Sequence, residues 1–274
     1  MSRRYRASIV ALFSSFWTNK QLIWELTRRD VVGRYRGSLM GLAWSFFNPI
    51  LMLAVYTFVF SVVFRSRWVS GGESSRVDFA IILFSGLIVH GLFAECINRA
   101  PGLILSNTNY VKKIVFPLEV LPWVAMGSAL FHALVSLLVL LTAFFLSNKY
   151  IPWTVVLFPL IVAPLVLLTM GLAWFLSATG VFVRDIGQTT SIITSILMFV
   201  SPVFYPSSNL PQKYRPLLQL SPLTFIIEQG RGVLIWGTLP NWYGWAAYSA
   251  TSVVVAWLGF WWFQKTRKGF ADVI

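Results

Sequence analysis

The sequence predicts an all-α integral membrane protein with six transmembrane helices, and three observations support this prediction. The chain has 274 residues, of which 57% are hydrophobic and 11% are charged, whereas soluble domains are about 25% charged. No charged residue occurs between Arg36 and Arg65, and each charge at a bilayer centre costs roughly 2.5–3.5 kcal/mol. The 13 Trp and nine Tyr residues are typical of aromatic belts at membrane surfaces. A soluble globular domain is therefore excluded.

Residues 1–38 predict a cytoplasmic segment with an N-terminal amphipathic interface helix. Between residues 8 and 17, apolar side chains recur at helical spacing and form one stripe. A second surface helix is predicted from Gln21 to Tyr35, with arginines at 28, 29, 34 and 36 on the water side. A basic helix directly before a span is expected to lie along the inner membrane surface. We find no signal-peptide pattern and expect the first span to direct insertion.

Six spans are predicted within a transmembrane domain of residues 39–263, since a crossing helix needs roughly 20 apolar residues. In chain order they are Leu39–Phe64, Phe79–Ile97, Leu118–Leu146, Trp153–Phe182, Gln188–Tyr205 and Tyr243–Phe263. The third and fourth exceed the bilayer thickness and should tilt or extend beyond the lipid. The fifth is short and ends where Pro202 and Pro206 interrupt regular helix.

Residues 206–242 precede the last span and predict two short outer re-entrant helices. The apolar runs Leu217–Leu220 and Leu223–Ile227 are too short to span, and prolines separate them. Bare loop cannot face lipid, because each unpaired backbone group there costs several kcal/mol. An ordinary soluble external loop is the alternative. Glu228 and Arg231 are three residues apart and can face each other on a helix, so we predict that this segment forms an outer gate.

The distribution of Lys and Arg predicts that both termini are cytoplasmic. Fifteen of the 22 basic residues fall on one side, in the N-terminal segment, the loop at 98–117, the turn at Arg184 and a cytoplasmic tail at 264–274. The side with more basic residues stays inside. Membrane topology thus explains the net charge of +13. We therefore expect no nucleic-acid partner.

The sequence offers no catalytic, cofactor or metal site. No Gly-Lys pair occurs, so the P-loop pattern is absent and ATP with its Mg²⁺ would have to bind a separate polypeptide. His90 and His132 lie in apolar spans without a carboxylate or Cys at metal-ligand spacing, and we interpret them as hydrogen-bonded packing residues. Paired carboxylates for glycosyl transfer are missing. The single Cys96 permits no intrachain disulfide.

Five motifs resemble the ABC-2 family of exporter permeases, and most closely the membrane subunit of O-antigen polysaccharide exporters. The family's entry into its first span resembles RRDVVGRYRGSLMGLAWSFFNP at 28–49. Its turn between spans two and three resembles NYVKKIVFPLEVLP at 109–122, and its turn before span five resembles VFVRDIGQ at 181–188. Its outer half resembles SPVFYP at 201–206 and SPLTFIIEQGR at 221–231. The likeness covers the chain from Trp17 onward.

The resemblance implies a dimer of such subunits that works with two separate ATPase subunits. Such a complex moves a finished glycan, attached to a polyprenyl lipid, out through the cytoplasmic membrane. We predict that force enters at the cytoplasmic turns and the surface helix. The candidate coupling residues are Arg34, Asn109, Tyr110, Lys112, Lys113, Arg184 and Asp185.

Polar side chains in spans one and five are candidates for a substrate channel. Thr190, Thr194, Ser201 and Tyr205 fall close to one helix face, and span one adds Asn48, Met52 and Tyr56. Packing of helices through small hydroxyl residues explains the pattern in span five equally well. The resemblance, in which spans one and five border the path, favours the channel. Aromatic and hydroxyl side chains can contact a sugar chain at many places without holding it tightly.

Three other functions stay open. The chain could be a permease of the same architecture that exports capsule polysaccharide or teichoic acid. It could also be a drug or ion exporter of the same superfamily. A membrane-embedded enzyme of glycolipid synthesis is an alternative of another class, but it would need catalytic groups at one membrane face, and no such set can be assembled.

Overall fold

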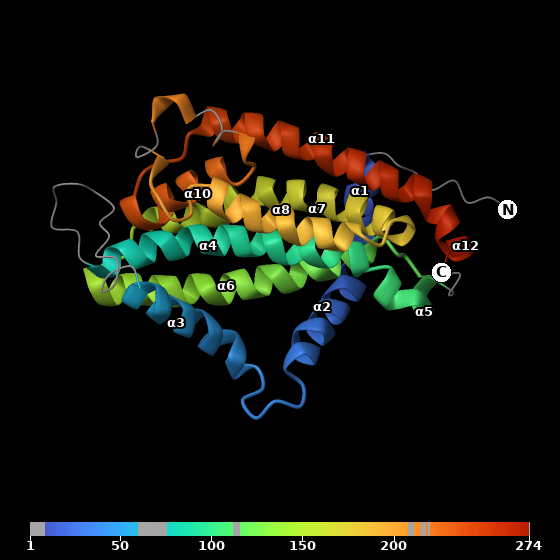
Figure 1. The fold of residues 1–274 in the computed structure, drawn as a ribbon, viewed down its shortest axis with the longest axis horizontal. Coiled ribbons are helices and arrows are strands. Elements are labelled where there is room, and N and C mark those ends of the chain that lie inside the picture. The colour runs from blue at the N-terminus through green and yellow to red at the C-terminus, as the bar shows by residue number, and fades with distance from the viewer. Residues whose placement is uncertain are drawn as a thin grey trace.

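The computed structural model describes residues 9–59, 76–111, 116–207, 211–214, 218 and 220–273, and every regular element within these ranges is helical. The helices α4 (Arg76–Arg99), α6 (Val120–Asn148), α7 (Phe158–Phe182) and α11 (Trp242–Thr266) run side by side (Figure 1). By length and composition these four, with the short turns that continue them, could cross a membrane. The predicted second, third, fourth and sixth spans are confirmed as long apolar helices.

The predicted first and fifth spans correspond to shorter helices. They are α3 (Ala43–Phe58), which has 16 residues, and α8 (Ile186–Val200), which has 15. Residues 60–64 of the predicted first span lie outside the described residues. In α8 the helix ends because Ser201 precedes Pro202 and adopts an extended conformation, as the residue before proline usually does. The count of six spans therefore stays a prediction.

The interior of the bundle is centred on α4 and on the contact between α7 and α11. In the most apolar stretch of α4, 78% of residues are buried, against 22% in α6, so α4 is the central helix. Gly171 of α7 faces Gly259 of α11, and a Cβ at either position would overlap the backbone of the other helix. Small residues at this crossing let the two backbones approach closely.

Both N-terminal segments are helical, as α1 (Ile9–Thr18) and α2 (Lys20–Tyr35), and their predicted place along the membrane surface stays a prediction. Apolar side chains of α2 pack against the first turns of α6, with Ile23 beside Val120 and Val124. The chain turns between α2 and α3 at Gly37 and Gly41, whose φ angles of +88° and +50° favour glycine. The two helices form a V below α6 in Figure 1.

At the opposite end from the termini, α10 (Thr224–Arg231) continues as a π-helical turn, η7 (Gly232–Trp236), and packs against α4 and α7. Gly237 then reverses the chain with a φ of +66° and leads into α11. The segment of the second predicted outer helix is thus helical, and the helix continues beyond Ile227 into the π-helical turn, whereas its re-entry into the membrane stays a prediction. Of the first predicted run, Leu217–Leu220, residues 217 and 219 lie outside the described residues, while Leu218 and Leu220 are helical. The short turn η6 (Gln212–Tyr214) lies before it in the chain.

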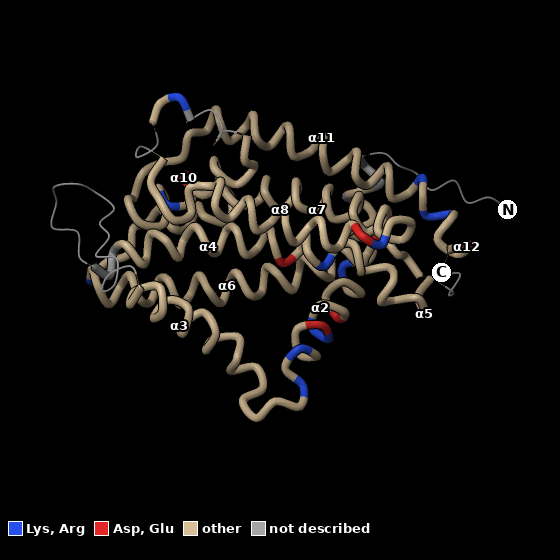
Figure 2. The backbone as a smooth tube through the Cα atoms, in the orientation of Figure 1, with Lys and Arg blue, Asp and Glu red and all other residues tan. Residues whose placement is uncertain are grey.

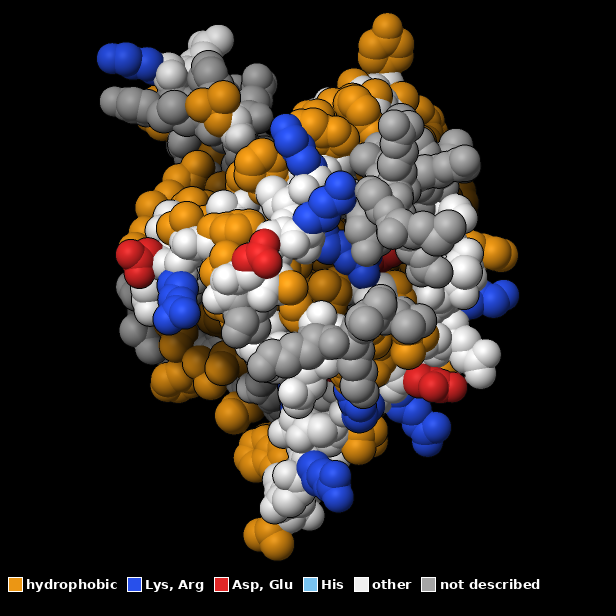
Figure 3. Space-filling model, turned by 90° about the vertical axis from the view of Figure 1, so that its right-hand side faces the viewer, with side chains coloured by type: hydrophobic (Ala, Val, Ile, Leu, Met, Phe, Trp, Pro, Cys, Tyr) orange, Lys and Arg blue, Asp and Glu red, His pale blue; other side chains and the backbone are white. Residues whose placement is uncertain are grey.

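Charged residues gather at the end of the bundle that carries the termini and along α2 (Figure 2). Seen from that end, acidic and basic side chains are spread over the surface, and hydrophobic side chains surround them (Figure 3).

Candidate functional site

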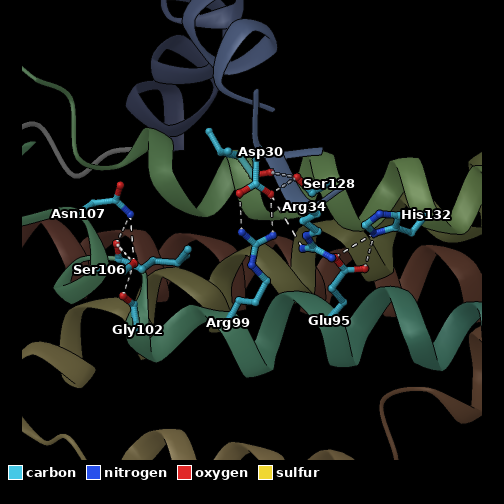
Figure 4. Close-up of polar contacts among 11 residues, drawn as sticks. Asp30, Arg34, Glu95, Arg99, Gly102, Ser106, Asn107, Ser128 and His132 are labelled. Atoms are coloured by element: carbon cyan, nitrogen blue, oxygen red, sulfur yellow. Dashed lines mark hydrogen bonds and ion pairs between the residues drawn. The ribbon is translucent and has the colours of Figure 1, made fainter. Parts of the chain in front are cut away.

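Three helices contribute a pair of polar residues spaced four apart, and the pairs meet where α2 joins the bundle. They are Asp30 and Arg34 on α2, Glu95 and Arg99 on α4, and Ser128 and His132 on α6 (Figure 4). Residues four apart lie on one helix face, so each helix presents both members of its pair together. We call these six residues the interface cluster.

Asp30 is the centre of one half of the interface cluster, which it forms with Arg99 and Ser128. Both guanidinium nitrogens of Arg99 donate to its two carboxylate oxygens, at 3.0 and 2.8 Å. The hydroxyl of Ser128 donates to the same carboxylate at 2.6 Å. A bidentate guanidinium–carboxylate pair is stronger and more directional than a single hydrogen bond. This carboxylate therefore attaches α2 to both α4 and α6.

Glu95 forms the other half. Arg34 lies 2.6 Å from one of its oxygens, and Nδ1 of His132 lies 3.0 Å from the other. The second ring nitrogen of His132 is 3.1 Å from the hydroxyl of Tyr35, at the end of α2. The interpretation of His132 as a hydrogen-bonded packing residue is confirmed. His90 is likewise bonded, at 2.9 Å from the carbonyl oxygen of Thr194.

The environment of Asp30 favours its charged form. Burial raises the pKa of this carboxyl, but the hydrogen bonds from Arg99 and Ser128 and the charges of Arg99 and Arg34 act in the opposite direction and outweigh it. The pKa consequently lies below its ordinary value of 3.8. Asp30 is thus ionised throughout the neutral range and keeps its pair with Arg99.

A cavity of about 320 Å³ opens between α2, α3, α4 and α6, beside the interface cluster. All three predicted channel residues of span one, Asn48, Met52 and Tyr56, line it. Three members of the interface cluster complete its polar wall: Arg34, Glu95 and His132. The predicted polar face of span one therefore borders a mixed polar and apolar cavity that also contains charged groups.

The predicted channel residues of span five lie elsewhere. Thr190, Thr194 and Ser201 are 3%, 2% and 0% exposed, and Thr194 donates to Asn98 of α4 at 3.0 Å. Ser201 bonds Ser221 at 2.7 Å. This placement corresponds to the packing alternative. Their role in a channel stays a prediction, and they do not line the cavity that the residues of span one border.

The exposed polar residues of α8 lie on its other faces. Ser191 and Ser195 are exposed, and their hydroxyls bond only the backbone of their own helix among the described residues. Tyr205, also predicted for the channel, is partly exposed and donates to the carbonyl oxygens of Phe199 and Val200.

The predicted coupling residues lie at the end of the molecule that carries the termini. Asn109 and Tyr110 belong to the short helix α5 (Thr108–Val111). The hydroxyl of Tyr110 accepts a hydrogen bond from Arg29 of α2 at 2.7 Å, and its ring stacks on Phe116. Lys112 and Lys113 lie outside the described residues.

Two further coupling residues, Arg184 and Asp185, are exposed in the turn between α7 and α8. Arg34 differs from both, since its guanidinium is directed at Glu95 and Asp30 within the interface cluster.

Another ion pair at this end joins Arg267 of the C-terminal segment to Glu119.

The predicted outer gate residues differ in their surroundings. Arg231 is 2% exposed and donates to the carbonyl oxygens of Ile82, Pro202 and Val203. Glu228 is partly exposed, and no ion pair within 4.0 Å joins it to Arg231 in the described part of the chain. Arg231 therefore holds α10 against α4 and the segment after α8, whereas a gating role for either residue stays a prediction.

Sequence reasoning did not select Asp30, Glu95, Arg99 or Ser128 as functional residues. The repeated spacing of four on three neighbouring segments was the available signal. Among the described residues, no group of three His, Cys, Asp or Glu side chains could hold a metal ion.

Known proteins match this chain over most of its length. A family model described as ABC-2 type transporter matches residues 21–235. The O-antigen export system permease protein RfbA of Myxococcus xanthus is 28% identical over 268 residues, covering 97% of this chain and 100% of that protein. The protein of the same name from Klebsiella pneumoniae is 26% identical, with 92% and 95% coverage. The polysialic acid transport protein KpsM of Escherichia coli is 22% identical, with 82% and 85% coverage. Because the family model spans well over half of the sequence, from α2 to η7, this chain belongs to the ABC-2 type transporter family.

Proposed function

We propose that this protein is the membrane subunit of an ATP-driven exporter that moves lipid-linked O-antigen polysaccharide across the cytoplasmic membrane. The observation that carries this proposal is the match to an O-antigen export permease over 97% of this chain and 100% of the relative. Export of capsule polysaccharide is the second candidate, because two kinds of capsule-type transport protein also match. Teichoic acid export is a third substrate alternative of the same architecture.

The energy source would be supplied by partners. The chain has no P-loop, and without one it cannot cradle the phosphates of ATP. We infer a complex of two copies of this chain with two ATP-binding-cassette subunits, which would carry ATP and Mg²⁺. Both termini would face the cytoplasm, because most Lys and Arg residues flank the spans on that side.

The ATPase subunits would engage the end of the bundle that carries α5 and the turn between α7 and α8. Tyr110 of α5 is bonded to α2, and α2 is bonded through Asp30 to two spans. A displacement of the turn at 98–117 would therefore reach α4 and α6 through α2. This chain of contacts supports the predicted coupling role of Arg34, Asn109 and Tyr110, with Arg184 and Asp185 as a second contact.

The glycan would pass between the two copies, along α3 and the exposed face of α8. On this proposal Asn48, Met52 and Tyr56 offer the polar and aromatic contacts on α3, and residues 206–242 act as the outer gate. Weak contacts at many positions would let a long polar chain keep moving.

The test is ATP-dependent translocation by the purified complex. The chain would be reconstituted into vesicles with its ATPase subunits and a radiolabelled polyprenyl-diphosphate-linked glycan. We expect ATP-dependent appearance of glycan in the compartment opposite the ATPase, and none when either subunit is omitted. ATP turnover by the chain alone would contradict the proposed division of labour. Deletion of the gene that removes capsule but leaves surface O-antigen intact would favour the second candidate.

A further inference from the structure

A groove of about 600 Å³ lies between α2 and α6 and reaches Leu42, at the start of α3. Its walls are almost entirely apolar and include Val31 and Val32 of α2 and Leu130 and Leu134 of α6. The two helices approach each other closely at Gly127 of α6 and Thr27 of α2, which both line the groove. If Gly127 carried a Cβ atom, that atom would lie 2.7 Å from the hydroxyl oxygen of Thr27. A groove of this shape and chemistry suits a hydrocarbon chain.

The groove has a cationic rim. Lys20 and Arg28 are the two charged residues that line it, and no acidic residue does. Both are exposed, and Arg28 forms no hydrogen bond or ion pair with any residue that the structure describes. The nearby carboxylate of Glu25 accepts from Gln21 and lies outside the groove lining. The rim is therefore complementary to an anion.

The depth of each part matches a lipid. The lining residues of α6 lie between seven and fourteen residues from its first residue, Val120, which is roughly 10–20 Å along a helix axis. They are therefore at the level of acyl chains. Lys20 lies at the beginning of α2, where its ammonium is 5.1 Å from the ring centre of Trp17, and Trp is typical of the head-group level.

We propose that the groove between α2 and α6 binds one anionic glycerophospholipid of the leaflet on the side of the termini. Its phosphate contacts Lys20 and Arg28, and one acyl chain lies along Val32, Leu130 and Leu134. Basic pockets between helices on the cytoplasmic side bind anionic head groups in this way. The bound lipid completes the contact of α2 with the bundle. The proposal does not depend on which substrate is exported.

Native mass spectrometry of the delipidated chain tests the head group. Phosphatidylglycerol and phosphatidylcholine with identical acyl chains are added at increasing concentration. We expect at least tenfold tighter binding of phosphatidylglycerol, and we expect this preference to disappear in the double variant Lys20→Gln/Arg28→Gln. Arg36→Gln, which removes an exposed cation at the end of α2 outside the groove, is the matched control and should keep the preference. Equal affinity for both lipids, or equal loss in the control, would overturn the proposal.

A second variant tests the tail. Leu134 is 55% exposed, so Leu134→Trp can fill the groove without disturbing the interior. It should weaken phosphatidylglycerol binding severalfold while both cations remain. Water-soluble glycerol phosphate should compete poorly with phosphatidylglycerol for the groove. If it competed at the same concentration as the lipid, the groove would bind an anion and not a lipid, and the proposal would be wrong. Leu134→Cys tests for another occupant, because a disulfide between two copies at this position would mean that a second subunit fills the groove.

Discussion

At the scale of single residues, the carboxylate of Asp30 holds the interface cluster together. Its side chain is 27% exposed and that of Arg99 is 29% exposed, so the pair lies between a surface and a buried ion pair. A surface pair contributes about 0–1 kcal/mol, whereas breaking a buried pair costs about 3–5 kcal/mol. The bidentate geometry and the third hydrogen bond from Ser128 place the cost of losing this carboxylate between these limits.

We expect Asp30→Asn to lower the free energy of unfolding by about 1–3 kcal/mol. The substitution leaves the guanidinium of Arg99 without its counter-charge and loosens α2 from α4. For a chain of this size the melting temperature should fall by roughly 2–12 °C, measured by intrinsic fluorescence in detergent. Glu25→Gln is the control, because Glu25 on the same helix makes only an exposed contact of 3.4 Å with Gln21. Equal melting of the two variants would assign no stabilising role to the cluster.

The lowered pKa of Asp30 sets the sign of a pH effect. The pKa of Asp30 is near 3.8 in the unfolded state and lower in the folded state. The ionised carboxylate therefore contributes to the free energy of unfolding above about pH 4, and this contribution is lost as the pH falls through the folded-state pKa. The difference in melting temperature between wild type and Asp30→Asn should stay constant from pH 7 to pH 5 and shrink below pH 4. A difference that already shrinks between pH 7 and pH 5 would assign the effect to another group.

At the scale of helices, α7 and α11 approach each other most closely at Gly171 and Gly259 among the described glycines. A methyl group on Gly259 would overlap the carbonyl oxygen of Gly171, and one on Gly171 would lie 2.5 Å from the carbonyl oxygen of Val255. Both obstacles are backbone atoms, which cannot move aside as a side chain can. The two spans can therefore keep this crossing only with glycine at both positions.

Gly259→Ala should consequently reduce the yield of folded protein in the membrane, because overpacking against backbone costs about 1–3 kcal/mol or more. Gly91→Ala is the matched control, since Gly91 is also inside a span and a Cβ there would meet nothing within 4 Å. The measurement is the monodisperse fraction in fluorescence-detected gel filtration. Normal yield of Gly259→Ala would mean that the helices can separate without loss of the fold.

The two faces of α8 have different expected roles. Ser195→Leu alters an exposed position and should lower export without changing the melting temperature. Thr194→Val removes an interior hydrogen bond to Asn98 and should lower stability by about 1 kcal/mol, with export reduced only in proportion to the folded protein. The opposite result, a stable but inactive Thr194→Val and an active Ser195→Leu, would mean that the buried hydroxyls face the path during transport.

The elements that could be predicted from the sequence are those with a local signal. Length and apolarity identify α4, α6, α7 and α11, and apolar periodicity identifies α1. The interface cluster could not be assembled, because Arg99 and Ser128, the hydrogen-bond partners of Asp30, lie on other helices. Their pairing with Asp30 depends on how α2 is placed against the bundle. The polar stripe with Thr194 had two readings for a related reason, since periodicity locates a face but does not identify the neighbouring helix.

At the scale of the whole molecule, α2 connects the exposed charged end to the spans. Adjacent residues on this helix contact different parts, since Arg29 bonds Tyr110 of α5 and Asp30 bonds Arg99 of α4. On the proposed coupling, a force applied to α5 would be transmitted to α4 through these two neighbouring side chains.

Tyr110→Phe separates this connection from simple packing. The variant keeps the ring that stacks on Phe116, with centroids 4.2 Å apart, but loses the hydroxyl that accepts from Arg29. We expect export to fall severalfold while ATP hydrolysis by the assembled complex continues, because the ATPase would no longer move α2. Tyr150→Phe removes a hydroxyl at the opposite end of the bundle, where the ring contacts Phe144, and should leave both activities unchanged. The measured quantity is the ratio of glycan translocated to ATP hydrolysed in vesicles. If Tyr110→Phe keeps the wild-type ratio, the contact between α2 and α5 only packs the turn, and coupling must pass through the turn at Arg184 and Asp185 instead.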